Sequence, residues 1–88
     1  FNKNTIGYFG TANGSNALYS NTIGFRNAAF GAFSLYLNTN GSDNTAVGYS
    51  AGDSYTDGSY NTFVGSGTDV SAATLSNCVA ISCFLLFL

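Results

Sequence analysis

The phrase NTAVGYSAG occupies residues 44–52, and a diverged copy, NTFVGSGTD, begins at residue 61. The two phrases start seventeen residues apart, and the same interval divides the rest of the chain without a gap. Four columns of the resulting arrangement keep one residue type in four of the five copies. A repeat of this kind indicates stacked units, since one unit cannot bury its apolar side chains alone. The five copies are residues 1–16, 17–33, 34–50, 51–67 and 68–84.

Glycine fills two of these columns, and threonine and alanine fill the other two. A glycine at a fixed place in every copy suggests a backbone demand, either a positive φ angle or a close approach of neighbouring chain. The first glycine column contains Gly7, Gly24, Gly41 and Gly58, and the second contains Gly14, Gly31, Gly48 and Gly65. The threonines are Thr5, Thr22, Thr39 and Thr56, and the alanines are Ala12, Ala29, Ala46 and Ala80.

The segments between the glycines are about four to six residues long and rich in Thr, Val, Phe and Tyr, which is typical of β-strands. No segment shows a helical apolar stripe, and the 11 Gly of the chain make helix costly. We therefore predict an all-β fold in which tandem 17-residue repeats stack as a β-solenoid or β-roll, or as a cross-β-like fibrous rod. Successive rungs would lie about 4.8 Å apart. Like residues, including Asn27, Asn44 and Asn61, would then form ladders along the stack.

Strand alternation gives an expectation for the inward face. We expect the column that follows the alanines to point inward, and Ala29 and Ala46 therefore to point outward. The alanine column is itself non-polar, and Phe63 occupies one of its positions. This leaves open a sheet that neighbouring chains or a second sheet cover on both faces. The column expected to point inward contains Phe30, Val47, Val64 and Ile81.

Residues 78–88 read CVAISCFLLFL, with Ser82 as the one clearly polar residue. A membrane-spanning helix needs about 20 apolar residues, so this run is too short to span a bilayer. It suits a buried strand, or an apolar end that another chain covers, because exposed apolar patches mark interfaces. We predict that residues 85–88 form an apolar C-terminal end that contacts another subunit, together with the residue at position 84. The contact residues would be Phe84, Leu85, Leu86, Phe87 and Leu88.

Two cysteines, Cys78 and Cys83, lie in the same run, five residues apart. On one straight strand they would face opposite sides, about 16 Å apart, so a disulfide between them would need an intervening turn. Two interpretations stay open. The thiols either pack as small buried apolar side chains or form an intermolecular disulfide.

Charge is scarce, with two basic residues, four acidic residues and a net charge of −2. Nucleic-acid binding needs clustered Lys and Arg, so this composition argues against that function. Eight Phe and six Tyr argue against a disordered chain. The surface must be made polar by Asn, Ser and Thr, which favours an extracellular repeat over a cytoplasmic enzyme. Because the chain starts at Phe1 and has no Met, we expect a processed product or a fragment whose export signal is removed or lies elsewhere.

The phrase at residues 44–52, its extension over residues 17–52 and the stretch GSYNTFVGSGTDVSAATLSNCVAIS at residues 58–82 resemble a known repeat family. This is the Asn-Thr-Ala-x-Gly repeat of bacterial and phage tail-fibre-like and cell-surface proteins, often found ahead of a chaperone-type peptidase domain. The chain is also similar, more loosely, to the head repeats of trimeric autotransporter adhesins. The resemblance covers residues 4–82, apart from Gly10 and Cys78 in the asparagine column.

The resemblance implies an extracellular, fibrous, β-rich stalk or adhesive surface that is commonly trimeric. It also implies that the asparagines of the phrase and the glycines four residues later are repeat-defining structural residues. These are Asn27, Asn44 and Asn61, with Gly31, Gly48 and Gly65.

The sequence lacks the residues that most catalytic sites and metal sites use. Without His or Glu, the chain can form neither a Ser-His-Asp triad nor a His-ligated metal site, and it has no G-x-x-x-x-G-K-[ST] motif. We therefore predict no enzyme activity, no cofactor and no metal. The stretch DSYTDG, with Asp53 and Asp57, fits a turn, since no Glu stands where a calcium loop needs one. Weak calcium binding by Asp43, Asp53, Asp57 and Asp69 remains the alternative.

Two surface features could carry a function besides assembly. Asn13 and Asn40 each begin an Asn-Gly-Ser sequon and are candidate glycosylation sites, although Asn-Gly pairs also form turns. Several tyrosines could stack on sugars or form packing ladders along the rod. They are Tyr19, Tyr36, Tyr49, Tyr55 and Tyr60.

The favoured hypothesis is a structural subunit of an extracellular fibre or filament on a cell or virion surface. It would assemble with copies of itself through strand stacking and the apolar C-terminal contact. The alternative is a carbohydrate- or receptor-binding adhesin module of a tail fibre or surface protein, with surface glycans as partners. Neither hypothesis involves nucleic acid or a membrane span.

Overall fold

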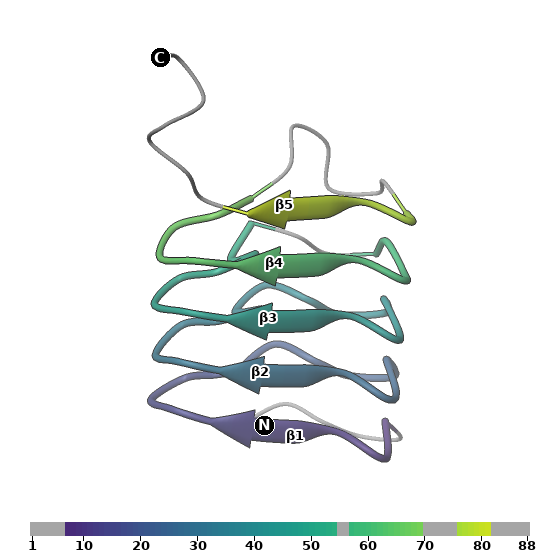
Figure 1. The fold of residues 1–88 in the computed structure, drawn as a ribbon. Helices are drawn as coiled ribbons and strands as arrows, with labels where there is room; N and C mark the ends of the chain where they lie inside the picture. The colour runs from purple at the N-terminus through teal and green to yellow at the C-terminus, as the bar shows by residue number, and fades with distance from the viewer. Residues whose placement is uncertain (1–6, 55–56, 70–75, 82–88) are drawn as a thin grey trace, which may run out of the picture.

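The computed structural model describes residues 7–54, 57–69 and 76–81. Within these ranges the chain forms five β-strands and no helix. Each strand pairs in parallel with the next one along the chain, so the sheet order is β1-β2-β3-β4-β5 (Figure 1). This stack of coils confirms the prediction of an all-β solenoid. The strands are β1 (Thr11–Asn13), β2 (Ala28–Phe30), β3 (Thr45–Val47), β4 (Thr62–Val64) and β5 (Val79–Ile81).

The register between neighbouring strands is seventeen residues at every step. Thr45 of β3 pairs with Ala28 of β2 and with Thr62 of β4. Hydrogen bonds between coils continue outside the sheet, where Leu35 N donates to Ala51 O at 2.9 Å. Parallel strands need a crossover connection, and here one turn of the coil supplies it. The turn is itself bonded to the next coil.

Each strand has three residues, fewer than the predicted four to six or so. Two backbone positions set this length. Asp43 has φ 60° and Gly48 has φ 131°, so extended backbone between them is confined to residues 44–47. The conformation of Asp43 recurs in every described rung, and of the residue types that occupy it only Asn and Asp adopt it readily. The residues at this corner are Phe9, Arg26, Asp43, Tyr60 and Asn77.

The predicted orientation of the strands is wrong. The middle residue of each strand points inward and its two neighbours point outward, so Ala46 is fully buried whereas Val47 is exposed. The cause is Asn44, which is buried and starts the alternation two residues before Ala46. The same pattern buries Ala29 and Phe63 and exposes Phe30, Val64 and Ile81.

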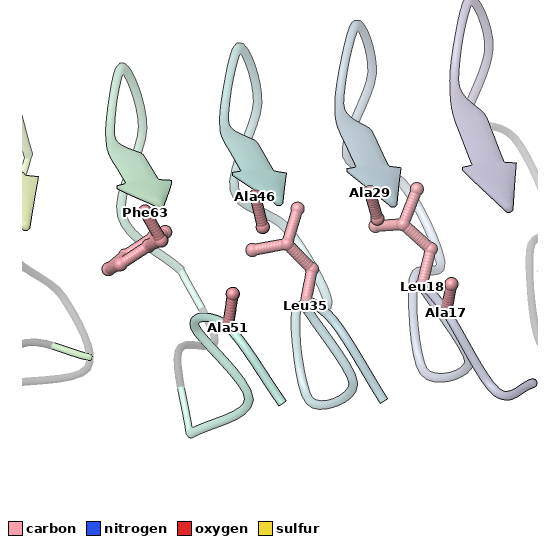
Figure 2. Close-up of a cluster of buried hydrophobic side chains, with 7 residues drawn as sticks. All are labelled: Ala17, Leu18, Ala29, Leu35, Ala46, Ala51 and Phe63. Atoms are coloured by element: carbon pink, nitrogen blue, oxygen red, sulfur yellow. The ribbon is translucent and has the colours of Figure 1, made fainter. Parts of the chain in front are cut away.

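The interior of the coil is narrow and holds one large apolar side chain in each of the rungs of β2, β3 and β4 (Figure 2). Leu35 lies against Ala46 of β3. In the following rung the sizes are exchanged, because Phe63 takes the alanine position and Gly52 takes the leucine position. A Cβ atom on Gly52 would lie 2.8 Å from Phe63 Cδ2. The buried apolar residues are Ala17, Leu18, Ala29, Leu35, Ala46, Ala51 and Phe63.

This exchange predicts that substitutions at Gly52 and Phe63 compensate for each other. Phe63→Ala should lower the free energy of unfolding by about 3–5 kcal/mol, because it empties the rung. Gly52→Leu should lower it by about 1–3 kcal/mol through overpacking. The double variant recreates the Leu35–Ala46 rung, and Leu35 itself has φ 49°, close to the 63° of Gly52. We expect it to recover most of the loss in urea unfolding. A double variant as unstable as the sum of the two losses would contradict the account.

Candidate functional site

A ladder of buried asparagine side chains joins the rungs from inside the coil. Asn27, Asn44 and Asn61 are each at most 2% exposed. Asn27 Oδ1 accepts a hydrogen bond from Asn44 N at 2.9 Å, and Asn44 Oδ1 accepts one from Asn61 N at 3.0 Å. Asn61 Oδ1 accepts one from Cys78 N at 2.9 Å, although Cys78 departs from the asparagine column. Each side-chain oxygen therefore holds the backbone of the next rung.

The side-chain amide nitrogens of the ladder also donate hydrogen bonds, two of them to the glycine corner of the next rung. Asn27 Nδ2 donates to Gly41 O, and Asn44 Nδ2 donates to Gly58 O, both at 2.8 Å. Asn61 Nδ2 donates to Asn44 Oδ1 at 3.0 Å. Buried polar groups are costly unless they are hydrogen-bonded, so these bonds allow amides to lie in the interior.

A second asparagine column, which the sequence analysis missed, faces the first one. Asn38 Nδ2 donates to Asn21 Oδ1 at 2.8 Å and to Gly41 O at 3.0 Å, and both side chains are buried. The signal was present in the sequence, because Asn4 stands one interval before Asn21 and the column keeps Asn as far as Asn38. In the described part of the chain, buried Asn38 Oδ1 accepts no hydrogen bond. The ladder ends there because no further asparagine follows.

The two glycine columns meet two different demands. A Cβ atom at Gly41 would overlap the carbonyl oxygen of Gly58 and come within 2.7 Å of Asn38 Oδ1, so the asparagine ladders leave no room for a side chain. At Gly48, φ is +131° and a Cβ atom would lie 2.7 Å from the carbonyl carbon of Gly65. The first column thus makes room for the asparagines, and the second ends the strands. The glycines equivalent to Gly41 are Gly7, Gly24 and Gly58, and those equivalent to Gly48 are Gly14, Gly31 and Gly65.

A serine ladder joins the corner that precedes the asparagines. Phe25 N donates to Ser42 Oγ, Ser42 N to Ser59 Oγ and Ser59 N to Ser76 Oγ, each at 3.0 Å. This column was not predicted from the sequence, because Tyr8 and Phe25 occupy its first two described positions. Side-chain ladders and backbone pairing therefore act together between successive rungs.

Four aromatic side chains form a cluster beside the sheet, which we call the aromatic cluster. Tyr19 and Tyr36 stack with ring centroids 5.3 Å apart, and Phe33 meets Tyr36 edge-on at 5.4 Å. Phe33 also meets Tyr49 edge-on at 6.0 Å, and Tyr49 is 58% exposed. Of the other two candidate tyrosines, Tyr60 is exposed and Tyr55 lies outside the described residues.

One exposed corner carries a charged pair. Arg26 donates to both carboxylate oxygens of Asp43, from Nε at 2.6 Å and from Nη2 at 2.9 Å, and its guanidinium lies 4.6 Å from the Phe25 ring centroid. The hydrogen bond lowers the pKa of Asp43 and raises the pKa of Arg26. Arg26 is exposed and Asp43 is partly exposed, so solvent screens the pair and it adds little to stability. Asp43 is thus engaged by a cation of the chain itself.

The other predicted site residues fall in different places. Asn13 lies exposed on β1. Asn40 is also exposed, and its Nδ2 donates to Asp57 Oδ1 at 2.9 Å, while Ser42 of the same sequon is buried in the serine ladder. Cys78 is a free, half-buried thiol. The remaining candidates lie outside the described residues, namely Cys83 and the apolar end Phe84, Leu85, Leu86, Phe87 and Leu88.

The described residues offer no concave site for a small molecule. They form no pocket and no group of three acidic or thiol side chains that could hold a metal ion. Nor do they include a helix long and apolar enough to cross a membrane. Comparison with family models, with curated proteins and with solved structures finds no match for this chain. The ladders and the outer surfaces are therefore the features from which a function can be inferred.

Removing one asparagine side chain should break the ladder between its rung and the next one. Asn44→Ala deletes the acceptor for Asn61 N and Asn61 Nδ2 and the donor to Gly58 O, so three hydrogen bonds to buried groups are lost. We expect a loss of about 3 kcal/mol or more in the free energy of unfolding, measured by urea denaturation. Asn40→Ala is the matched control, because Asn40 is exposed, and it should cost about 0.5 kcal/mol or less. Equal losses for the two variants would contradict the role of the buried ladder.

Proposed function

We propose that this chain is a structural segment of an extracellular fibre, in which stacked coils form the rod. The observation that carries this proposal is the constant register of the ladders. Each rung offers to the next rung the same groups that it receives from the one before, as Asn44 does between Asn27 and Asn61. A solenoid of this kind extends by adding equivalent rungs.

Two further features support a structural role. The buried polar side chains are used for stacking, and the described residues contain no pocket for a substrate. The outermost described strands, β1 and β5, present sheet edges to which another rung can add. The next rung can come from further repeats in the same chain or from another copy. The apolar end at residues 84–88 remains our candidate for the contact between copies.

Electron microscopy of the purified protein tests this proposal. We expect unbranched filaments of constant width, and we expect Asn44→Ala to reduce them because it interrupts the ladder. Discrete particles alone, at every concentration, would contradict the proposal. A variant that lacks residues 84–88 tests the apolar contact separately, since unchanged filaments would exclude that contact as the means of assembly.

A second candidate function is an adhesin module that binds carbohydrate, and the aromatic cluster favours it. Aromatic rings are frequent contact residues at binding surfaces, and Tyr49 presents one in solvent against Phe33, which in turn contacts Tyr36. A glycan array probed with the full chain is the test. Binding that is lost in Tyr49→Ala and kept in Tyr60→Ala would support this function, because the two tyrosines are 58% and 60% exposed. No binding to any glycan would contradict it.

A further inference from the structure

The outer face of the sheet carries two straight columns of side chains. The first column comes from the first residue of each strand, and the third column comes from the third residue. The two columns lie about 6.6 Å apart along the strands, and successive rungs lie about 4.8 Å apart. The first column contains Thr11, Ala28, Thr45, Thr62 and Val79, and the third contains Asn13, Phe30, Val47, Val64 and Ile81.

The third column leaves large apolar side chains in solvent. Phe30 is 42% exposed, Val47 43%, Val64 38% and Ile81 59%. These side chains cannot turn inward, because the buried asparagines fix the alternation of each strand. Neither column contains a charged residue. A continuous, uncharged apolar strip marks a contact surface.

A second copy of this chain fits the strip better than an unrelated partner does. The side chains of each column recur at every rung. Only a surface with the same period can pack against them along their whole length, and another copy has that period. A face without charges gives a charged partner no electrostatic advantage. The occupant that matches both properties is the same face of another copy.

The relative direction of the two rods decides which columns meet. When two faces pack with the rods parallel, their strands run in opposite directions, so the first column of one copy lies opposite the third column of the other. When the rods are antiparallel, each column lies opposite its own counterpart. The side-chain sizes within one rung distinguish these two arrangements.

The rung of β2 pairs the largest outward side chain with the smallest. Phe30 is the one aromatic residue of the third column, and Ala28 is the smallest residue of the first column. The next rung has two side chains of medium size, Thr45 and Val47. In parallel copies with the rungs level, Phe30 of one copy meets Ala28 of the other, where the most room is available. Antiparallel rods would place Phe30 against a larger residue of the third column.

We propose that the outer face of the sheet packs against the same face of further copies of this chain, with the rods parallel and in register and with Phe30 of one copy seated over Ala28 of its neighbour. This inference rests on the proposed function, since it names the lateral partner within the fibre. In a two-fold arrangement a pair of copies makes this contact between the columns twice, whereas in a three-fold arrangement each pair of neighbours makes it once.

A double-mutant cycle tests this contact by sedimentation equilibrium of the full chain under reducing conditions. Ala28→Thr introduces the residue that Thr45 and Thr62 already place in the first column, so the coil should fold normally. The added atoms fill the space that the neighbour's Phe30 needs, and we expect the dissociation constant to rise about 10-fold or more. Phe30→Val leaves a gap at the contact and should also raise it about 10-fold. The double variant recreates the Thr45–Val47 rung and should return to within about 3-fold of the original chain.

Ser66→Thr is the matched control, because it enlarges an exposed residue outside the strands and should leave association unchanged. Effects of Ala28→Thr and Phe30→Val that are merely additive, or a chain that stays monomeric at about 1 mM, would overturn the contact. Electron microscopy of the same samples separates this outcome from failure of the proposed function. Filaments that persist without lateral pairing would reject the contact alone, whereas the absence of filaments at every concentration would reject the fibre as well.

Discussion

The hydrogen bonds of the buried asparagines are the constraint on which the rest of the coil depends. An amide can lie in the interior only when its oxygen and nitrogen are bonded, and the partners of Asn44 are in the next rung. The rungs must therefore stay in one register, because a shift of one residue would leave both groups unpaired. The close approach of Gly41 to Gly58 follows from the same bonds, since any side chain at this corner would overlap them.

The ladder also decides which side chains reach the interior. Since Asn44 points inward, Ala46 must do so as well, and Val47 must point outward. The interior is consequently narrow, and one large side chain is enough to fill a rung, as Leu35 or Phe63 does. The apolar outer face is a consequence of this polar interior. Its apolar side chains remain 38–59% exposed, and this exposed area can make a contact.

The period of the sequence was sufficient to predict the fold class, because seventeen residues recur without a gap and each stacked copy needs the next. The orientation of the strands could not be predicted from alternation alone, since alanine and valine are both apolar and the sequence does not say which column is wider. The buried asparagine two residues before Ala46 held that information. Asn44 was predicted to form a ladder, but its inward direction, which makes Val47 point outward, was not inferred. The strand length depends on the left-handed backbone at Asp43, a conformation that Phe9, Arg26 and Tyr60 share without any residue preference for it.

Amide hydrogen exchange, followed residue by residue by NMR, tests the central role of the asparagine ladder most directly. The amides of Asn44 and Asn61 donate to side-chain oxygens of the ladder, whereas the amide of Thr45 donates to the backbone carbonyl of Asn61 at 2.8 Å. If the ladder holds the rungs together, Asn44 and Asn61 should exchange within about 10-fold of Thr45, through the same cooperative opening. Exchange at Asn44 and Asn61 that is about 1,000-fold faster than at Thr45 would contradict the account, because the ladder would then open while the sheet stays closed.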